Sequence, residues 1–226
     1  MVSPLPSRNP PYRQLCQEFH SRIVNGRWPR GRLLKPDGLI AEEFGVSVAT
    51  VRRAFDILER LHIIERVRGH RKIVSLDTAR RAAVLTNVVD LNGAPVAGDV
   101  EIRSVEALPQ SKLRVGRVRF YRGRPFAIEC AEIAATTDRP SLEALAVSAS
   151  NAVFDGRIAV TKQEYAAVVE PCKQAVKLFA LKPSASVLEI RRTLFDLDEQ
   201  PLECSIAHCV LGTDLRYRTA EPNQIL

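Results

Sequence analysis

The sequence has no apolar run approaching the roughly 20 residues that a membrane-spanning helix needs. Its start, MVSPLPSRNPPY, lacks the apolar segment of a secretory signal. The five cysteines are odd in number, form no CxxC pair and have apolar surroundings, so we expect buried or partly buried free thiols in a reducing compartment. These absences predict a cytoplasmic protein that does not associate with membranes.

The second part of the chain also lacks the usual signatures of catalysis. Residues 76–226 contain no nucleophile–base pairing, no metal-ligand set and no phosphate-binding loop. Cys204, His208 and Cys209 lie close together, but further ligands at a usual zinc spacing are missing. We therefore expect no metal, no cofactor and no enzymatic activity.

The charge is unevenly distributed along the 226 residues. Residues 1–75 contain 14 Lys/Arg and 7 Asp/Glu, a net of +7, whereas residues 76–226 contain 19 of each sign. The whole excess of positive charge therefore lies in the first third of the chain. Such segregation indicates a polyanion-binding module joined to a neutral one. The sequence contains no basic amphipathic helix with an aromatic face, so a membrane surface is not favoured as the polyanion.

Residues 36–60 predict two short helices joined by a tight turn. Asp37 is a candidate cap for the first helix and Ser47 for the second, and Gly45 supplies the left-handed conformation that ends a helix. The second helix carries hydroxyl and guanidinium groups near its start, which suit the major groove: Thr50, Arg52 and Arg53. The alternative is an ordinary helical hairpin whose basic face is only solvated.

The flanking segments favour DNA. Residues 12–25 predict an amphipathic helix, and an extended connector follows, in which Lys35 can meet a phosphate. Residues 63–74 predict two short strands around Gly69 with a basic tip formed by Arg66, Arg68, His70, Arg71 and Lys72. A helix–turn–helix followed by such a hairpin is a winged helix, although a hairpin that is merely soluble is the simpler alternative.

Residues 10–75 resemble the DNA-binding domain of GntR-type transcriptional regulators. The resemblance rests on PPYRQL, the LIAEEFGVS–TVRRAF core and RVRGHRKIV, which occur in the family's order. It implies DNA contacts at Thr50, Arg52, Arg68 and Gly69, to which the residue types add Lys35, Ser47, Arg53, His70 and Arg71. Three positions depart from the family pattern, because Gly38 and Val48 replace arginines and the wing contains GHRK instead of GRGT. We therefore expect an unusual operator with a larger share of backbone contacts.

The remainder predicts a second domain of a different class. Residues 1–9 are rich in Pro and Ser and are expected to be disordered, and residues 76–82 form a charged linker. Residues 83–226 contain β-branched segments with alternating polarity and two helical segments, at 139–150 and 172–181. This pattern indicates an α+β domain dominated by antiparallel sheet.

The second domain resembles the UTRA effector-binding domain of the HutC branch of GntR regulators. GRVRFYRGRPFAIECAEI and PCKQAVKLFALKPSASVLEIRRTLFDLDEQPLE carry the resemblance, over residues 83–219. It implies a fold similar to chorismate lyase, dimerisation and binding of a small molecule. The positions expected to contact that effector are Arg117, Arg119, Glu129, Tyr165 and Glu203. Cys209 replaces an expected pocket tyrosine, so no phosphosugar ligand is assigned.

Arg117 and Arg119 also draw attention without the resemblance. They alternate on one strand, so their side chains share a face and need an anion between them. Glu129 on the paired strand is a candidate internal partner, and a surface salt-bridge ladder with Glu101 or Glu129 is the structural alternative.

The sequence therefore predicts a ligand-responsive regulator that binds double-stranded operator DNA. It is expected to be a homodimeric repressor released by a small anionic metabolite. Two alternatives stay open: a chorismate-lyase-like enzyme domain fused to a DNA-binding head, and a regulator whose second domain only dimerises.

Overall fold

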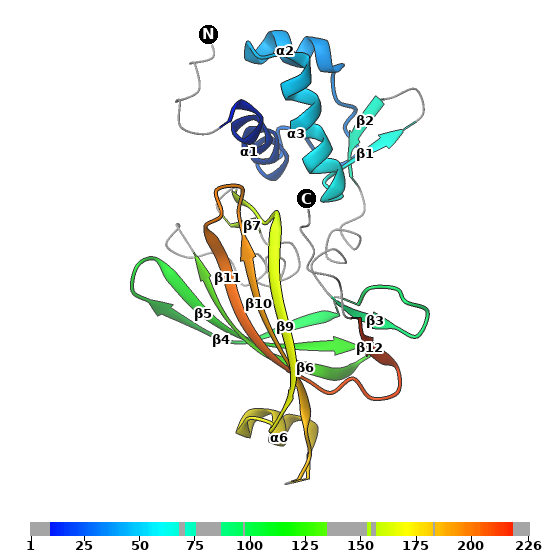
Figure 1. The fold of residues 1–226 in the computed structure, drawn as a ribbon, viewed down its shortest axis with the longest axis vertical. Helices are drawn as coiled ribbons and strands as arrows, with labels where there is room; N and C mark the ends of the chain where they lie inside the picture. Colours follow the sequence, from blue (N-terminus) through cyan, green and yellow to red (C-terminus); the bar gives the residue numbers. More distant parts are fainter. Residues whose placement is uncertain are drawn as a thin grey trace.

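The computed structural model shows a helical head joined to an antiparallel sheet domain, which confirms the predicted fold class (Figure 1). The predicted disordered start, the 76–82 linker and the 139–150 helix lie outside the residues that the structure describes. These residues are 10–67, 71–75, 87–96, 98–134, 153–154, 157–182 and 184–218.

The head is a three-helix domain followed by a two-stranded wing. Gly45 ends α2 with φ 64°, and Ser47 caps α3 by accepting the Thr50 N–H at 3.1 Å, both as predicted. The predicted cap at Asp37 is wrong, because Pro36 occupies that position and Asp37 is the first helical residue. The elements are α1 (Pro11–Val24), α2 (Asp37–Phe44), α3 (Val48–Arg60), β1 (Ile64–Val67) and β2 (Arg71–Val74).

An aromatic cluster holds the three helices together. Phe19 of α1 stacks on Phe55 of α3 with ring centroids 4.8 Å apart, and both side chains are fully buried. Phe44 meets Phe19 edge-on at 5.5 Å, and Trp28 lies 5.2 Å from it. Offset and edge-to-face pairs of this kind are favoured by the ring quadrupoles. The cluster therefore fixes which side of α3 is turned inward.

A carboxylate at the start of α2 ties the wing to the helices. Asp37 Oδ1 accepts a hydrogen bond from Lys72 Nζ of β2 at 2.7 Å, and Asp37 Oδ2 lies 3.5 Å from Arg52 Nε of α3. The Lys72 side chain is only 9% exposed, and its ammonium group lies 4.8 Å from the centroid of the Phe55 ring. Lys72 is therefore part of the head's packing and not a free cation at the tip of the wing.

The second domain is built on a six-stranded antiparallel sheet with strand order β4-β5-β6-β11-β10-β9. A turn at Arg122 and Gly123, both with positive φ, connects β5 to β6. Helix α6 (Lys173–Phe179) joins β9 to β10. The strands of the sheet are β4 (Asp99–Leu108), β5 (Lys112–Tyr121), β6 (Arg124–Ala134), β9 (Thr161–Val169), β10 (Val187–Phe195) and β11 (Pro201–Cys209).

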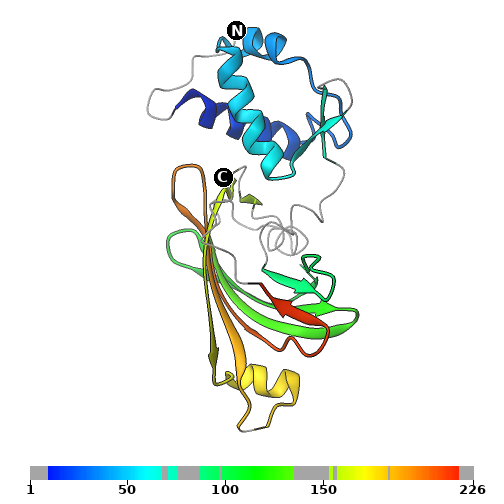
Figure 2. The same cartoon turned by 45° about the vertical axis from the view of Figure 1, so that its right-hand side comes forward.

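Two small ladders complete the described part of this domain. Strands β3 (Val88–Asp90) and β12 (Leu215–Tyr217) pair with each other and cross one face of the curved sheet (Figure 2). Strands β7 (Val153–Phe154) and β8 (Arg157–Ile158) form a short hairpin at the end of the sheet domain that faces the head.

The two faces of the large sheet differ in polarity. One face buries apolar side chains such as Val115, Ala131 and Leu194, and the opposite face exposes Cys130 and Cys204. All five cysteines are free, as predicted, but Cys130, Cys172 and Cys204 are exposed rather than buried. Cys130 and Cys204 are exposed because strand alternation turns them to the outer face.

The head rests directly on the sheet domain. Ile158, Val160 and Leu197 of the sheet domain belong to the same buried cluster as Phe19 and Phe55 of the head. Arg13 Nη1 of α1 lies 3.9 Å from Asp198 Oδ1, in the turn between β10 and β11. The interface thus combines apolar burial with a long ion pair. No helix in the described part of the chain is long and apolar enough to cross a membrane.

We expect Asp37→Asn to lower the free energy of unfolding by about 2 kcal/mol, because it leaves the nearly buried Lys72 ammonium without its counter-charge. Urea denaturation of the full chain measures the change. The matched control is Glu59→Gln, which weakens the more exposed Arg66–Glu59 pair and should cost below about 1 kcal/mol. Equal losses in the two variants would contradict the role assigned to Asp37.

Candidate nucleic-acid interface and effector site

The exposed start of α3 presents a small polar surface. The Ser47 and Thr50 hydroxyl groups lie 2.9 Å apart, and Val48 is 36% exposed beside them. A Cβ atom built on Gly38 would meet nothing within 4 Å, so packing does not require glycine there. Gly38 and Val48, which replace the family's arginines, therefore change the chemistry of this surface, and the packing does not require these replacements.

Arg52 is the guanidinium most clearly held at this surface. Its side chain is 69% exposed, and its Nε lies 3.5 Å from Asp37 Oδ2. Lys35 lies in the connector before α2, and its ammonium group donates to Glu43 Oε2 at 2.9 Å. Hydrogen bonds from Arg22 and Lys35 hold the pKa of Glu43 below its usual range, so Glu43 stays charged beside Lys35.

Arg53 points in a different direction from Arg52. Its guanidinium carbon lies 3.9 Å from the centroid of the Tyr12 ring of α1. Successive residues of a helix are about 100° apart around its axis, so Arg52 and Arg53 cannot share a face. The structure therefore does not bring Arg53 together with the other predicted DNA contacts.

The wing contributes fewer free cations than its sequence suggests. Arg66 is held against α3 by hydrogen bonds to Glu59 and Asp56, and Lys72 is buried. Arg71 is exposed at the start of β2. The predicted contacts Arg68, Gly69 and His70 lie outside the described residues.

A buried cluster of charges lies on the inner face of the large sheet. Arg117 of β5 is directly opposite Glu129 of β6 and donates to it at 2.8 and 3.0 Å. Arg117 also donates to Glu203 of β11 at 2.7 Å, and Arg119 donates to Glu129 at 2.9 Å. Arg192 of β10 completes the cluster, with Nη2 at 3.2 Å from Glu129 and 3.8 Å from Glu203. We call these five residues the sheet cluster.

The sheet cluster carries three positive and two negative charges. Burial alone would lower the pKa of Arg117, but attraction and hydrogen bonds from Glu129 and Glu203 raise it above its ordinary value. Burial would raise the pKa of Glu129, but Arg117 and Arg119 hold it well below its usual range. For Arg119, burial and repulsion by Arg117 and Arg192 outweigh the attraction of Glu129, so its pKa is lowered. Arg117 and Arg119 therefore differ in the direction of their pKa shifts, although both donate to Glu129.

Arg192 was not among the residues predicted from the sequence, although the strand pattern contains a signal for it. Ile190 and Leu194 of β10 are buried, so the alternation of the strand turns Arg192 inward and Arg191 outward. Arg191 is 61% exposed and pairs with Glu189. Arg191 and Arg192 therefore lie on opposite faces of the sheet.

The strand register also shows where two other positions that were expected at the pocket lie. Tyr165 of β9 lies opposite Arg191 on the outer face and is 70% exposed, so it is not brought together with the sheet cluster. Cys209, which replaces the expected tyrosine, is buried in the same row as Arg119. Burial raises the pKa of the Cys209 thiol to about 12, so it is neutral at physiological pH.

Comparison with known proteins identifies the head. The family model of bacterial regulatory proteins of the gntR family matches residues 11–74, the span from α1 to the end of β2. The mannosyl-D-glycerate transport/metabolism system repressor MngR of Escherichia coli K12 is 27% identical over 137 residues. That alignment covers 53% of this chain and 57% of the repressor, so the chain spans little more than half of that relative's length.

The chain is also similar to solved structures of transcriptional regulators. A GntR family transcriptional regulator from Listeria monocytogenes is 31% identical over 34% of this chain and 68% of that one, with a TM-score of 0.32. The possible transcriptional regulator YydK from Bacillus subtilis is 15% identical over 89% of this chain and 95% of that one, with a TM-score of 0.45. Residues 11–74, the head of the chain, therefore form a domain of the gntR family of bacterial regulatory proteins.

Proposed function

We propose that the protein is a transcriptional repressor whose affinity for its operator changes when a small anion binds in the sheet domain. The observation that carries the DNA-binding part is the exposed Ser47–Thr50–Arg52 surface at the start of α3. Hydroxyl and guanidinium groups at the start of a recognition helix suit base edges in the major groove. A relative that is itself a repressor supports the direction of the effect.

Phosphate contacts would come from the cations around that surface. Lys35, which precedes α2, and Arg71, which follows α3, are both exposed. Arg68 and Gly69 are proposed contacts by resemblance, and His70 is proposed from its residue type. A homodimer, also proposed by resemblance, would set two recognition helices about 34 Å apart on one face of the DNA.

The sheet cluster is the proposed effector site, and its charge balance indicates the class of ligand. Three guanidinium groups share two carboxylates, so these five residues together have one positive charge in excess. Among the described residues, Arg117 Nη1 and Glu203 Oε2 have no hydrogen-bond partner. A ligand with one carboxylate or phosphate and a neighbouring hydroxyl would balance the charge and satisfy both atoms. An effector site in this domain is also what its resemblance to the UTRA domain of the HutC branch implies.

A second candidate function follows from the same contacts. Every guanidinium of the sheet cluster already has a carboxylate within 3.2 Å. A cluster that is compensated internally can also serve structure alone, and the domain would then act only in dimerisation. The variants of Arg119 and Glu129 described below distinguish these two functions.

We expect Arg52→Ala to weaken binding to the preferred sequence by about 1–3 kcal/mol and to flatten the preference at one base pair. An operator would first be selected from a random DNA library, and fluorescence anisotropy would then compare its single-base variants. Arg103→Ala removes an exposed arginine of β4 and serves as the control. Equal weakening on all sequences would contradict direct base contact by Arg52.

We expect Arg71→Ala to reduce the slope of log affinity against log salt by about one, because one phosphate contact is lost. Specificity should change little. Arg66→Ala is the matched control in the same wing, since Glu59 and Asp56 already engage that guanidinium. An unchanged slope in Arg71→Ala would place this residue away from the DNA.

We expect Arg119→Gln to fold with nearly unchanged stability, because it leaves two positive and two negative charges in the sheet cluster. Glu129→Gln should lose about 3–5 kcal/mol, because three guanidinium groups then share one buried carboxylate. Thermal denaturation measures both changes. A similar loss of stability in the two variants would contradict the charge balance.

The same Arg119→Gln protein tests the effector. A panel of organic acids, urocanate-like imidazoles, sugar phosphates, acyl compounds and mannosyl-D-glycerate would be screened by thermal shift. A ligand at 100 times its Kd should stabilise the protein by about 2.7 kcal/mol. A hit abolished by Arg119→Gln supports the effector site, and the absence of any such hit favours a purely structural domain.

A further inference from the structure

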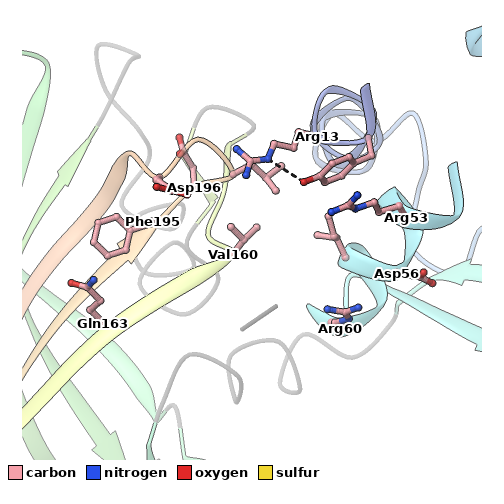
Figure 3. A pocket seen from close by; sticks show the side chains of 12 residues that line it. Arg13, Arg53, Asp56, Arg60, Val160, Gln163, Phe195 and Asp196 are labelled. Carbon is pink, nitrogen blue, oxygen red and sulfur yellow. Dashed lines mark hydrogen bonds between the residues drawn. The ribbon is translucent and has the colours of Figure 1, made fainter. Parts of the chain in front are cut away.

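A cavity of about 750 Å³ lies between the head and the sheet domain (Figure 3). Its volume is within the range of small-molecule sites in proteins. Residues of α1 and α3 form one wall, and the start of β9 with the end of β10 and its following turn form the other. Ile158, Val160 and Leu197 join the buried core of the head beside it, so the two walls are in apolar contact.

Three carboxylates line the cavity, and one of them, Glu199 in the turn after β10, attracts Arg13 of α1 and helps to raise its pKa. The other two already have partners. Asp56 Oδ1 lies 2.9 Å from Arg66, which does not line the cavity. Asp196 Oδ2 accepts from Arg157 at 3.1 Å, and its Oδ1 accepts two backbone N–H groups of its own turn. Neither side chain is therefore available to balance a cation inside the cavity.

Two guanidinium groups on the helical wall, those of Arg53 and Arg60, have no such counter-charge among the described residues. Arg53 contacts the ring of Tyr12, and neither Arg53 nor Arg60 forms an ion pair with another described residue. In Figure 3 the Arg53 guanidinium is directed from α3 towards the sheet domain, whereas the Asp56 carboxylate is directed away from it. Besides Arg13, which lies 3.9 Å from Asp198, the helical wall therefore carries two guanidinium groups that form no ion pair with the described residues.

The spacing of the two cations is set by the helix. Arg53 and Arg60 are seven residues apart, so they lie on one face of α3 about 10 Å apart along its axis. Val160 and Phe195 face them from the sheet domain and offer an apolar surface. This arrangement fits a molecule with an anionic group at each end and an apolar middle.

We infer that this cavity is a second ligand site, specific for an extended dianion such as a medium-chain organic diacid. Arg53 and Arg60 bind its two ends, and Val160 and Phe195 contact its chain. The site is distinct from the sheet cluster, because none of the five residues of that cluster lines it. It is assembled from both domains, so a bound ligand links the head to the sheet domain.

The test is isothermal titration of the full chain, without DNA, with suberate as the probe and octanoate as the matched probe with a single carboxylate. We expect suberate to bind at least tenfold more tightly than octanoate, because only suberate can pair with both guanidinium groups. Arg53→Gln and Arg60→Gln should each weaken suberate binding about tenfold. Both side chains are exposed, so the variants are expected to fold, and circular dichroism checks this.

Two control variants locate the bound probe. Arg103→Gln removes an exposed arginine far along the sheet and should leave binding unchanged. Arg119→Gln should also leave it unchanged, whereas loss of suberate binding in Arg119→Gln would place the probe in the sheet cluster and overturn the inference. Equal affinity for octanoate, or no effect of Arg53→Gln and Arg60→Gln, would overturn it as well. Because no DNA is present, these outcomes are independent of the proposed repressor activity.

Discussion

The packing of Phe55 against Phe19 fixes the rotation of α3, and the uses of that helix follow from it. Because the side of α3 that carries Phe55 is buried under α1, the rest of the surface of α3 is available for other contacts. One part carries Arg52, which Asp37 holds beside α2 and the wing. Another part carries Arg53 and Arg60, which face the sheet domain. A change in the aromatic cluster would therefore displace both surfaces together.

The sheet cluster shows a different constraint, since burying charge in a sheet is costly unless each charge is compensated. Arg117 is fully buried, yet its two carboxylate partners keep it charged. Hydrophobic side chains of similar volume would fill the same space with less risk to stability. An arrangement of three guanidinium groups around two carboxylates is therefore in keeping with the anion recognition that we propose.

Local patterns predicted most of the elements, and contacts between distant segments explain what they missed. Gly45, Ser47 and the alternation of β5, β6, β10 and β11 are properties of a few adjacent residues, and the structure has them as predicted. Asp37 was misjudged because it is the first residue of the helix and not its cap, and its carboxylate pairs with Lys72, which is 35 residues away. Arg53 and the interdomain cavity depend on segments more than 100 residues apart, for which no local periodicity exists.

The two proposed ligand sites would influence DNA binding by different routes. A ligand in the sheet cluster contacts no residue of the head, so its effect must pass through the interface formed by Ile158, Val160 and Leu197. A ligand in the interdomain cavity contacts α3 itself, on the helix whose first turn forms the proposed DNA surface. A ligand changes an equilibrium only by its difference in affinity for the two states. Because the cavity needs both domains to be complete, any movement of the head away from the sheet domain would lose that binding energy, and the cavity ligand would therefore favour the docked head.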